Sequence, residues 1–113
     1  MWLFTKRGFV SIVVDRNDSK LMWMRARRKE DLEDLLTATL RPYWLQYITH
    51  SFVADYAYRV AIPARDVEKI VMELIREIDY DNFKSGCHLT RPDDHDYHRT
   101  LRTVWSVGKQ LEV

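Results

Sequence analysis

The residues best suited to chemistry lie close together near the C-terminal end of the chain, between positions 87 and 98. This stretch holds a cysteine, three histidines and three aspartates: Cys87, His88, Asp93, Asp94, His95, Asp96 and His98. On a helix, His95 and His98 lie one turn apart and can share a metal ion, with Cys87 or His88 as a third ligand. The spacing is loose, however, and no CxxC or HExxH motif supports it. We therefore favour a solvated His95 and a His98 that packs beside Trp105, and keep a metal-dependent enzyme as the second alternative.

Catalysis by a pair of acidic residues or by the Cys87 thiol has less support than the metal site. The acids at 79–81 and 93–96 would need a cleft that separates their pKa values before they could act as acid and base. Those at 93–96 have a simpler role at the positive end of the last helix. Cys87 and His88 are adjacent in sequence, whereas a nucleophile and its base must meet in space beside a third, orienting group. We expect no catalytic residue, no bound metal and no cofactor, and thus a binding protein rather than an enzyme.

A basic run with an aromatic residue at its start spans residues 23–29, WMRARRK. Strand alternation places Trp23, Arg25 and Arg27 on one sheet face, which Tyr58 or Arg59 joins depending on the register. Rings that stack bases beside cations that hold phosphates are how sheet-based binders of single-stranded nucleic acid work. The acids at 30–34 lower the local potential, and no GxxxxGK, GxGxxG or RNP-type motif is present. Such a nucleic-acid-binding module is the first alternative function.

Aromatic residues are more abundant than one small core easily hides, with four Trp and six Tyr. If helices cover one face of the sheet, some rings remain near solvent, and exposed aromatic patches mark interaction surfaces. We therefore favour a small non-catalytic interaction domain that binds a protein partner, or self-associates as a homodimer, through an aromatic and arginine-rich sheet face. The candidate partner-binding residues are Phe9, Trp23, Arg25, Arg27, Tyr58 and Arg59. In the competing interpretation, segments 1–5 and 43–53 cover this face.

The fold that positions these residues is predicted to be α+β. One helix, 63–78, carries Val67, Ile70, Val71, Leu74, Ile75 and Ile78 at helical spacing and must press this face onto a sheet. Strands are expected at 9–14, 21–27 and 55–62, with short extended runs at 2–5 and 47–49. Further helices are expected near 30–40 and from 92–94 to about 108. A polar connector is expected at 79–86, where Gly86 suits a left-handed stop, followed by an irregular stretch at 87–89. The result is an antiparallel sheet of about four strands, in ββαββαα order, with helices mainly on one face.

The bulk properties exclude several classes of protein. The chain of 113 residues predicts one domain, residues 1–113. A net charge of +1 argues against nucleic-acid binding by bulk electrostatics alone. The single cysteine allows no internal disulfide, and no apolar run of the roughly 20 residues needed to cross a membrane is present. We expect a cytoplasmic protein without a secretory signal.

Several short motifs resemble those of a group of small uncharacterised bacterial proteins of about this length. They are the opening MWLFTxxGF, DYxxR at 55–59, EIDYxNFK ending at Lys84, and Tyr97-His98 followed by Trp105. The resemblance spans most of the chain, and none of its motifs is a known catalytic signature. It implies a bacterial-type cytoplasmic domain and carries no implication about chemistry.

Overall fold

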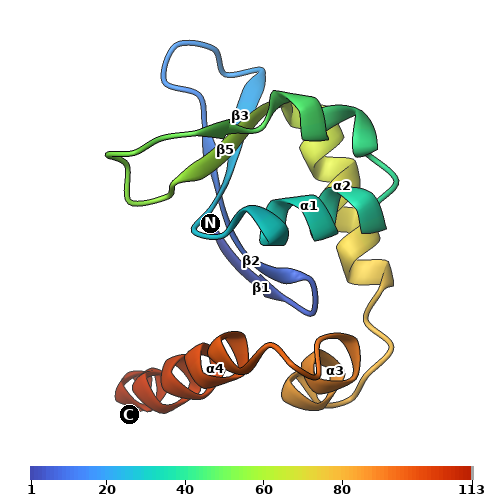
Figure 1. The fold of residues 1–113 in the computed structure, drawn as a ribbon, viewed down its shortest axis with the longest axis vertical. Coiled ribbons are helices and arrows are strands. Elements are labelled where there is room, and N and C mark those ends of the chain that lie inside the picture. The colour runs from blue at the N-terminus through green and yellow to red at the C-terminus, as the bar shows by residue number, and fades with distance from the viewer. Residues whose placement is uncertain (113) are drawn as a thin grey trace. The chain divides into compact units, whose positions relative to one another are not determined.

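The computed structural model describes residues 1–112, which form two compact units, Met1–Ile78 and the residues from Asp79 onward. The first unit contains a five-stranded antiparallel sheet and the helices α1 and α2, and the second contains the helices α3 and α4 (Figure 1). The predicted α+β class with an antiparallel sheet is confirmed, with five strands in place of about four. A single domain over the whole chain stays a prediction.

The elements follow one another in an order slightly different from the predicted one. They are β1 (Trp2–Thr5), β2 (Gly8–Val14), β3 (Leu21–Ala26), α1 (Lys29–Ala38), the 3-10 helix η1 (Pro42–Tyr47), β4 (Thr49–His50), β5 (Tyr58–Pro63), α2 (Ala64–Arg76), α3 (Phe83–Thr90), α4 (His95–Gly108) and the 3-10 helix η2 (Lys109–Leu111). The additional strand arises at the N-terminus, where a turn at 6–7 separates β1 from β2.

The sheet has the strand order β1-β2-β3-β5-β4, and every pair of neighbours is antiparallel. Met24 of β3 lies between Ile12 of β2 and Val60 of β5, and all three are buried. Helices α1 and α2 pack on this face, where Leu35 and Ile70 join the same core. Because side chains alternate along a strand, the residues between these positions lie on the opposite face of the sheet.

The turn between β1 and β2 depends on a close contact between Gly8 and Asp31. Gly8 has a φ of +123°, and a Cβ atom there would lie 2.5 Å from Cγ of Asp31. The buried Asp31 carboxylate accepts hydrogen bonds from the backbone N–H of Phe9 and from the Arg28 guanidinium, at 3.3 and 3.0 Å. A side chain at position 8 would therefore meet both backbone strain and a steric clash.

Helix α1 ends in a Schellman motif. The N–H of Arg41 donates to the carbonyl of Leu36 at 2.7 Å, and the N–H of Leu40 donates to that of Thr37 at 3.1 Å. The motif needs a left-handed residue, and that residue is Leu40, with a φ of 57°. Pro42 follows at once, as predicted for the end of this helix.

Helix α2 has a wider apolar stripe than the sheet covers. Val67, Ile70 and Leu74 are buried, in agreement with the predicted core-facing surface. Ile75 is 61% exposed, and Ile78, which follows the helix, is 55% exposed. The prediction that these two also press onto the sheet was wrong, because they lie at the margin of the stripe, where the sheet leaves them open to solvent.

The second unit contains a helix that the sequence analysis missed. Residues 83–90 form α3, where a connector and an irregular stretch were expected, and this prediction was wrong. Asn82 caps the helix by accepting a hydrogen bond from the N–H of Ser85. Gly86 is buried within α3, where a Cβ atom would lie 2.7 Å from Cδ1 of Tyr80. This glycine permits a close ring contact instead of ending a helix.

Helix α4 begins as predicted, since Asp94 accepts a hydrogen bond from the N–H of Tyr97 at 3.2 Å and caps the helix. Its expected apolar stripe is only partly buried, because Tyr97 and Leu101 are buried while Trp105 is exposed. No helix in residues 1–112 is both long enough and apolar enough to cross a membrane.

Candidate functional site

The register of the sheet gathers most of the predicted binding residues on the face opposite the core. Arg25 of β3 lies between Ser11 of β2 and Arg59 of β5, and Trp23 lies two positions away on the same face. Of the two alternatives left open by the sequence, Arg59 therefore joins this face. Tyr58 alternates to the other side, where it packs against the core. Tyr58 is thus not part of the candidate surface.

Arg25 and Arg59 form a like-charged pair across two neighbouring strands. The Arg25 guanidinium donates to the Ser11 hydroxyl at 2.8 Å, and the Arg59 guanidinium donates to the carbonyl of Tyr56 at 3.3 Å. The Nε atoms of Arg25 and Arg59 are both buried and have no hydrogen-bond partner in the described structure. No carboxylate of residues 1–112 pairs with either arginine or with Arg27.

The loop that precedes β5 brings a tyrosine ring against two of these arginines. Tyr56 is buried, with the guanidinium carbons of Arg25 and Arg27 at 4.6 and 5.1 Å from its ring centroid. Phe9 extends the aromatic layer, with its ring centroid 6.3 Å from that of Tyr56. We call the set Phe9, Trp23, Arg25, Arg27, Tyr56 and Arg59 the arginine face. Tyr56 was missed because the expected strand at 55–62 placed it on the face opposite Arg59, whereas β5 begins only at Tyr58 and Tyr56 lies in the loop before it.

The rings at the margin of the arginine face differ in exposure. Phe4 stacks on Phe9 with centroids 4.4 Å apart, so that each ring covers the other. Trp2, on the edge strand β1, is 67% exposed and contacts Phe9 edge to face. The predicted covering segments therefore behave differently: 1–5 supplies an edge strand, whereas Trp44 and Leu45 of η1 pack against the core.

Trp23 is held by a carboxylate at the far end of the arginine face. Its indole Nε1 donates to Oδ1 of Asp15 at 2.7 Å. This hydrogen bond, together with those from the backbone N–H groups of Asn17 and Asp18, lowers the pKa of Asp15 against a smaller opposing effect of burial. The Arg59 guanidinium lies 6.0 Å from the Trp23 ring centroid. Asp15 thus fixes the orientation of the ring and stays charged to a lower pH than usual.

The histidines and the cysteine of the predicted metal cluster are arranged differently from a metal site. His88 and His98 stack with ring centroids 3.8 Å apart, and Nε2 of His98 lies 2.7 Å from the carbonyl oxygen of Arg91. His95 is exposed at the start of α4, and Cys87 is buried. The described residues contain no group of three or more His, Cys, Asp or Glu placed to hold a metal ion.

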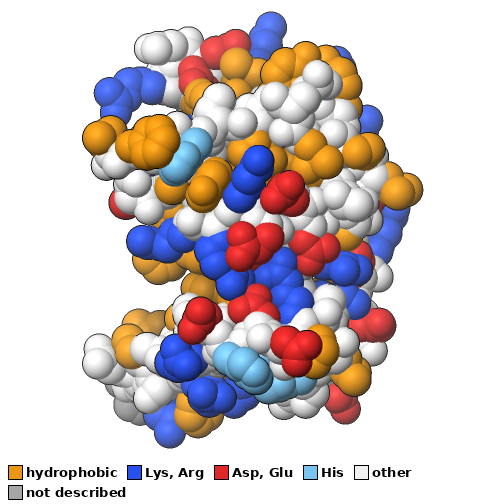
Figure 2. Space-filling view, viewed as in Figure 1, with side chains coloured by type: hydrophobic (Ala, Val, Ile, Leu, Met, Phe, Trp, Pro, Cys, Tyr) orange, Lys and Arg blue, Asp and Glu red, His pale blue; other side chains and the backbone are white. Residues whose placement is uncertain are grey.

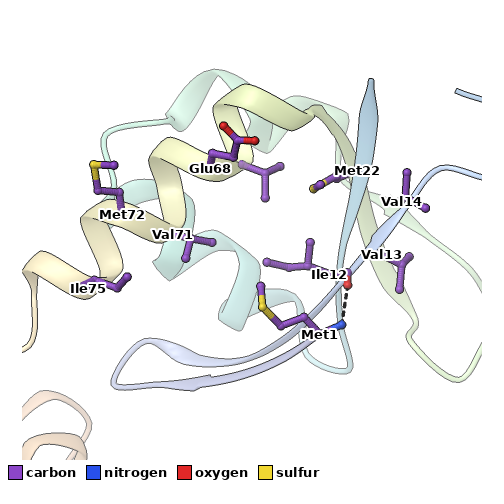
Figure 3. Close-up of a pocket in the computed structure, with 10 residues that line it drawn as sticks. Met1, Ile12, Val13, Val14, Met22, Glu68, Val71, Met72 and Ile75 are labelled. Atoms are coloured by element: carbon purple, nitrogen blue, oxygen red, sulfur yellow. Dashed lines mark hydrogen bonds between the residues drawn. The ribbon is translucent and has the colours of Figure 1, made fainter. Parts of the chain in front are cut away.

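A second surface of the first unit is an apolar groove between α2 and the sheet, with a volume of about 440 Å³. Figure 3 shows Val71, Met72 and Ile75 of α2 on one side and Ile12 and Met22 of the strands on the other. The α-amine of Met1 donates to the carbonyl of Ile12 at 2.8 Å beside it. The exposed half of the α2 stripe thus forms one wall of this groove.

Comparisons of the chain with protein-family models, with curated proteins and with solved structures found no match. The resemblance to small bacterial proteins therefore stays a prediction.

Proposed function

We propose that this protein is a non-catalytic interaction domain that binds an acidic segment of a partner protein on its arginine face. The observation that carries the proposal is the pairing of Arg25 with Arg59 across β3 and β5. Like charges directly opposite each other destabilise a sheet. A carboxylate from a partner would offset this repulsion by bridging the two guanidinium groups.

The chemical composition of the arginine face supports a protein ligand. Interfaces between proteins are enriched in Tyr, Trp and Arg, and the residues that dominate binding energy are of these types. Here a buried Tyr56 holds Arg25 and Arg27 by cation–π contacts, and Trp23 is oriented by Asp15. A surface fixed in this way loses little side-chain entropy on binding.

The burial and stacking of the aromatic rings favour an acidic protein segment over single-stranded nucleic acid as the ligand. Sheet-based binders of single strands offer ring faces on which bases stack. On the arginine face Tyr56 is buried and in contact with the guanidinium groups of Arg25 and Arg27, and Phe9 is stacked on Phe4. Among the aromatic rings described on the arginine face and at its margin, only that of Trp2 is mostly exposed. The guanidinium fork, in contrast, matches a carboxylate directly.

The proposal is tested by titrating the protein with two fluorescent probes, an Asp/Glu-rich peptide and an oligothymidylate. We expect the peptide to bind and the Arg25→Met, Arg59→Met double variant to lose about 2 kcal/mol or more of binding free energy. The matched control removes two charges from α2 instead, with Arg65→Met and Arg76→Met, both exposed. We expect this control to bind as the unmodified protein does.

Two results would contradict the proposal. Equal losses in the arginine-face variant and the α2 variant would show that only overall charge matters. Binding of the oligothymidylate without binding of the peptide, with an affinity that falls steeply with salt, would establish the nucleic-acid alternative instead.

A further inference from the structure

The second unit contains a small basic pocket between α3 and α4, apart from the arginine face. It has a volume of about 160 Å³ and is lined by Lys84, His88, His98, Leu101 and Arg102. Figure 2 shows His side chains beside Lys and Arg side chains in the region of these two helices. A pocket of this volume has room for a tetrahedral oxyanion such as phosphate.

The positive lining follows from matched spacing on the two helices. Lys84 and His88 are four residues apart on α3, and His98 and Arg102 are four residues apart on α4. Residues at this spacing lie on one helical face. Two basic faces therefore meet at the pocket, and none of its lining residues is acidic.

The hydrogen bond of His98 fixes which ring nitrogen carries a proton. Since the carbonyl of Arg91 can only accept, Nε2 of His98 must donate across the 2.7 Å that separates them. The His98 ring is buried, and the exposed His88 ring lies nearly parallel to it, at an interplanar angle of 16°. Positive charge on both stacked rings would be repulsive, and an anion in the pocket would offset this repulsion.

We infer that this pocket binds a phosphate group, with Lys84 and Arg102 as its charged ligands and the imidazoles of His88 and His98 in its lining. Arg102 is exposed on α4, and the described structure gives it no ion pair. Lys84 also lies 4.9 Å from the ring centroid of Trp105, which places an aromatic side chain next to the pocket. The same chemistry suits free inorganic phosphate and a phosphate monoester.

The test is an NMR titration of the intact protein with inorganic phosphate, in which sodium chloride keeps the ionic strength constant. The ring C–H signals of the four histidines are followed. We expect saturable shifts for His88 and His98 and none for His50 and His95, which serve as internal references. Shifts that grow linearly without saturation, or that chloride reproduces, would overturn the inference.

Two variants separate binding from simple charge loss. Lys84→Met with Arg102→Met should weaken phosphate binding at least tenfold, whereas Arg99→Met with Lys109→Met, which also removes two positive charges, should leave it unchanged. Arg99 and Lys109 are exposed residues of the second unit that do not line the pocket, so this variant is the matched control. Equal weakening by both would overturn the inference. A parallel titration with O-phosphoserine distinguishes the source: tighter binding than inorganic phosphate supports an ester ligand, and weaker binding supports the free anion.

Discussion

Arg25 and Arg59 lie directly opposite each other on β3 and β5, and the Nε of each is buried without a hydrogen-bond partner. A buried donor left unsatisfied costs about 1–3 kcal/mol. The sheet therefore retains, on the face opposite its helices, a pair of residues that work against the stability of the free protein. Such local conflicts occur where a surface is used for binding.

Replacing Arg59 by methionine should separate stability from binding. Arg59→Met keeps an unbranched apolar side chain at this position while it removes the like charge and one buried Nε. We expect the free energy of unfolding to stay unchanged or to rise by about 1 kcal/mol, because the relief offsets the lost hydrogen bond to Tyr56. Urea denaturation measures this. Binding of the acidic peptide should fall in the same variant, and a stability loss of several kcal/mol would refute our account of the pair.

The contact between Gly8 and Asp31 predicts that the first turn tolerates no side chain. Gly8→Ala forces a residue with a Cβ into a φ of +123° and against the Asp31 carboxylate. We expect a loss of about 3 kcal/mol or more in thermal or urea unfolding.

Gly108 provides the matched control, since a Cβ there meets no atom within 4 Å. It lies at the end of α4, where alanine has the higher helix propensity. Gly108→Ala should therefore leave stability unchanged or raise it by up to about 1 kcal/mol. Equal effects at the two glycines would contradict the role assigned to the contact with Asp31.

The left-handed conformation of Leu40 predicts a stabilising substitution. A non-glycine residue in this conformation carries roughly 1–2 kcal/mol of strain, and the Leu40 side chain is itself exposed. Leu40→Gly should thus raise the free energy of unfolding by about 1 kcal/mol, as differential scanning calorimetry or urea denaturation can show. Leu40→Ala keeps the Cβ and should give no gain, so an equal gain from both variants would exclude relief of strain as the cause.

The hydrogen bond from Trp23 predicts how Asp15 responds to acid. Because the pKa of Asp15 in the folded protein lies below its ordinary value of 3.8, the folded state binds its proton less readily. The resulting stabilisation is present above this ordinary value and is lost as the pH falls through the lower, folded-state pKa. NMR titration of the Asp15 carboxyl carbon should place its midpoint below 3.8.

Trp23→Phe removes the largest cause of this shift and should move the pKa of Asp15 upward. Trp105→Phe, which changes a tryptophan of the second unit, should leave it where it was. An unchanged midpoint in Trp23→Phe would mean that the backbone N–H groups of Asn17 and Asp18 hold the carboxylate alone.

The parts of the fold that sequence reasoning found are those with a strong local pattern. The alternation from Leu21 to Arg27 identified β3 and the shared face of Trp23 and Arg25, and helical spacing identified the core of α2. Sequence reasoning could not give the register of the sheet, because no local sequence pattern decides whether Tyr58 or Arg59 lies opposite Arg25. The structure decides it through the pairing of β3 with β5.

Helix α3 shows a different limit. Gly86 suggested a left-handed stop, and glycine also disfavours a helix interior by about 1 kcal/mol. In the structure Gly86 lies inside the helix despite this cost, because only a residue without a side chain allows the close contact with the Tyr80 ring. The cap at Asn82 was the available signal, and it was read as part of a polar connector. The stacking of His88 on His98 could not be predicted either, because His88 lies on this unpredicted helix.

The strand order also has a kinetic consequence. Strands β1, β2 and β3 are neighbours in both sequence and space, so they can assemble by closing short loops, whereas β5 reaches β3 only after α1, η1 and β4. Closing a longer loop costs more entropy, and non-local pairings slow folding. We therefore expect the N-terminal meander to be structured in the transition state and β5 to dock after it. Destabilising substitutions in β5, such as Val60→Ala, should then chiefly accelerate unfolding in stopped-flow experiments and change the refolding rate little.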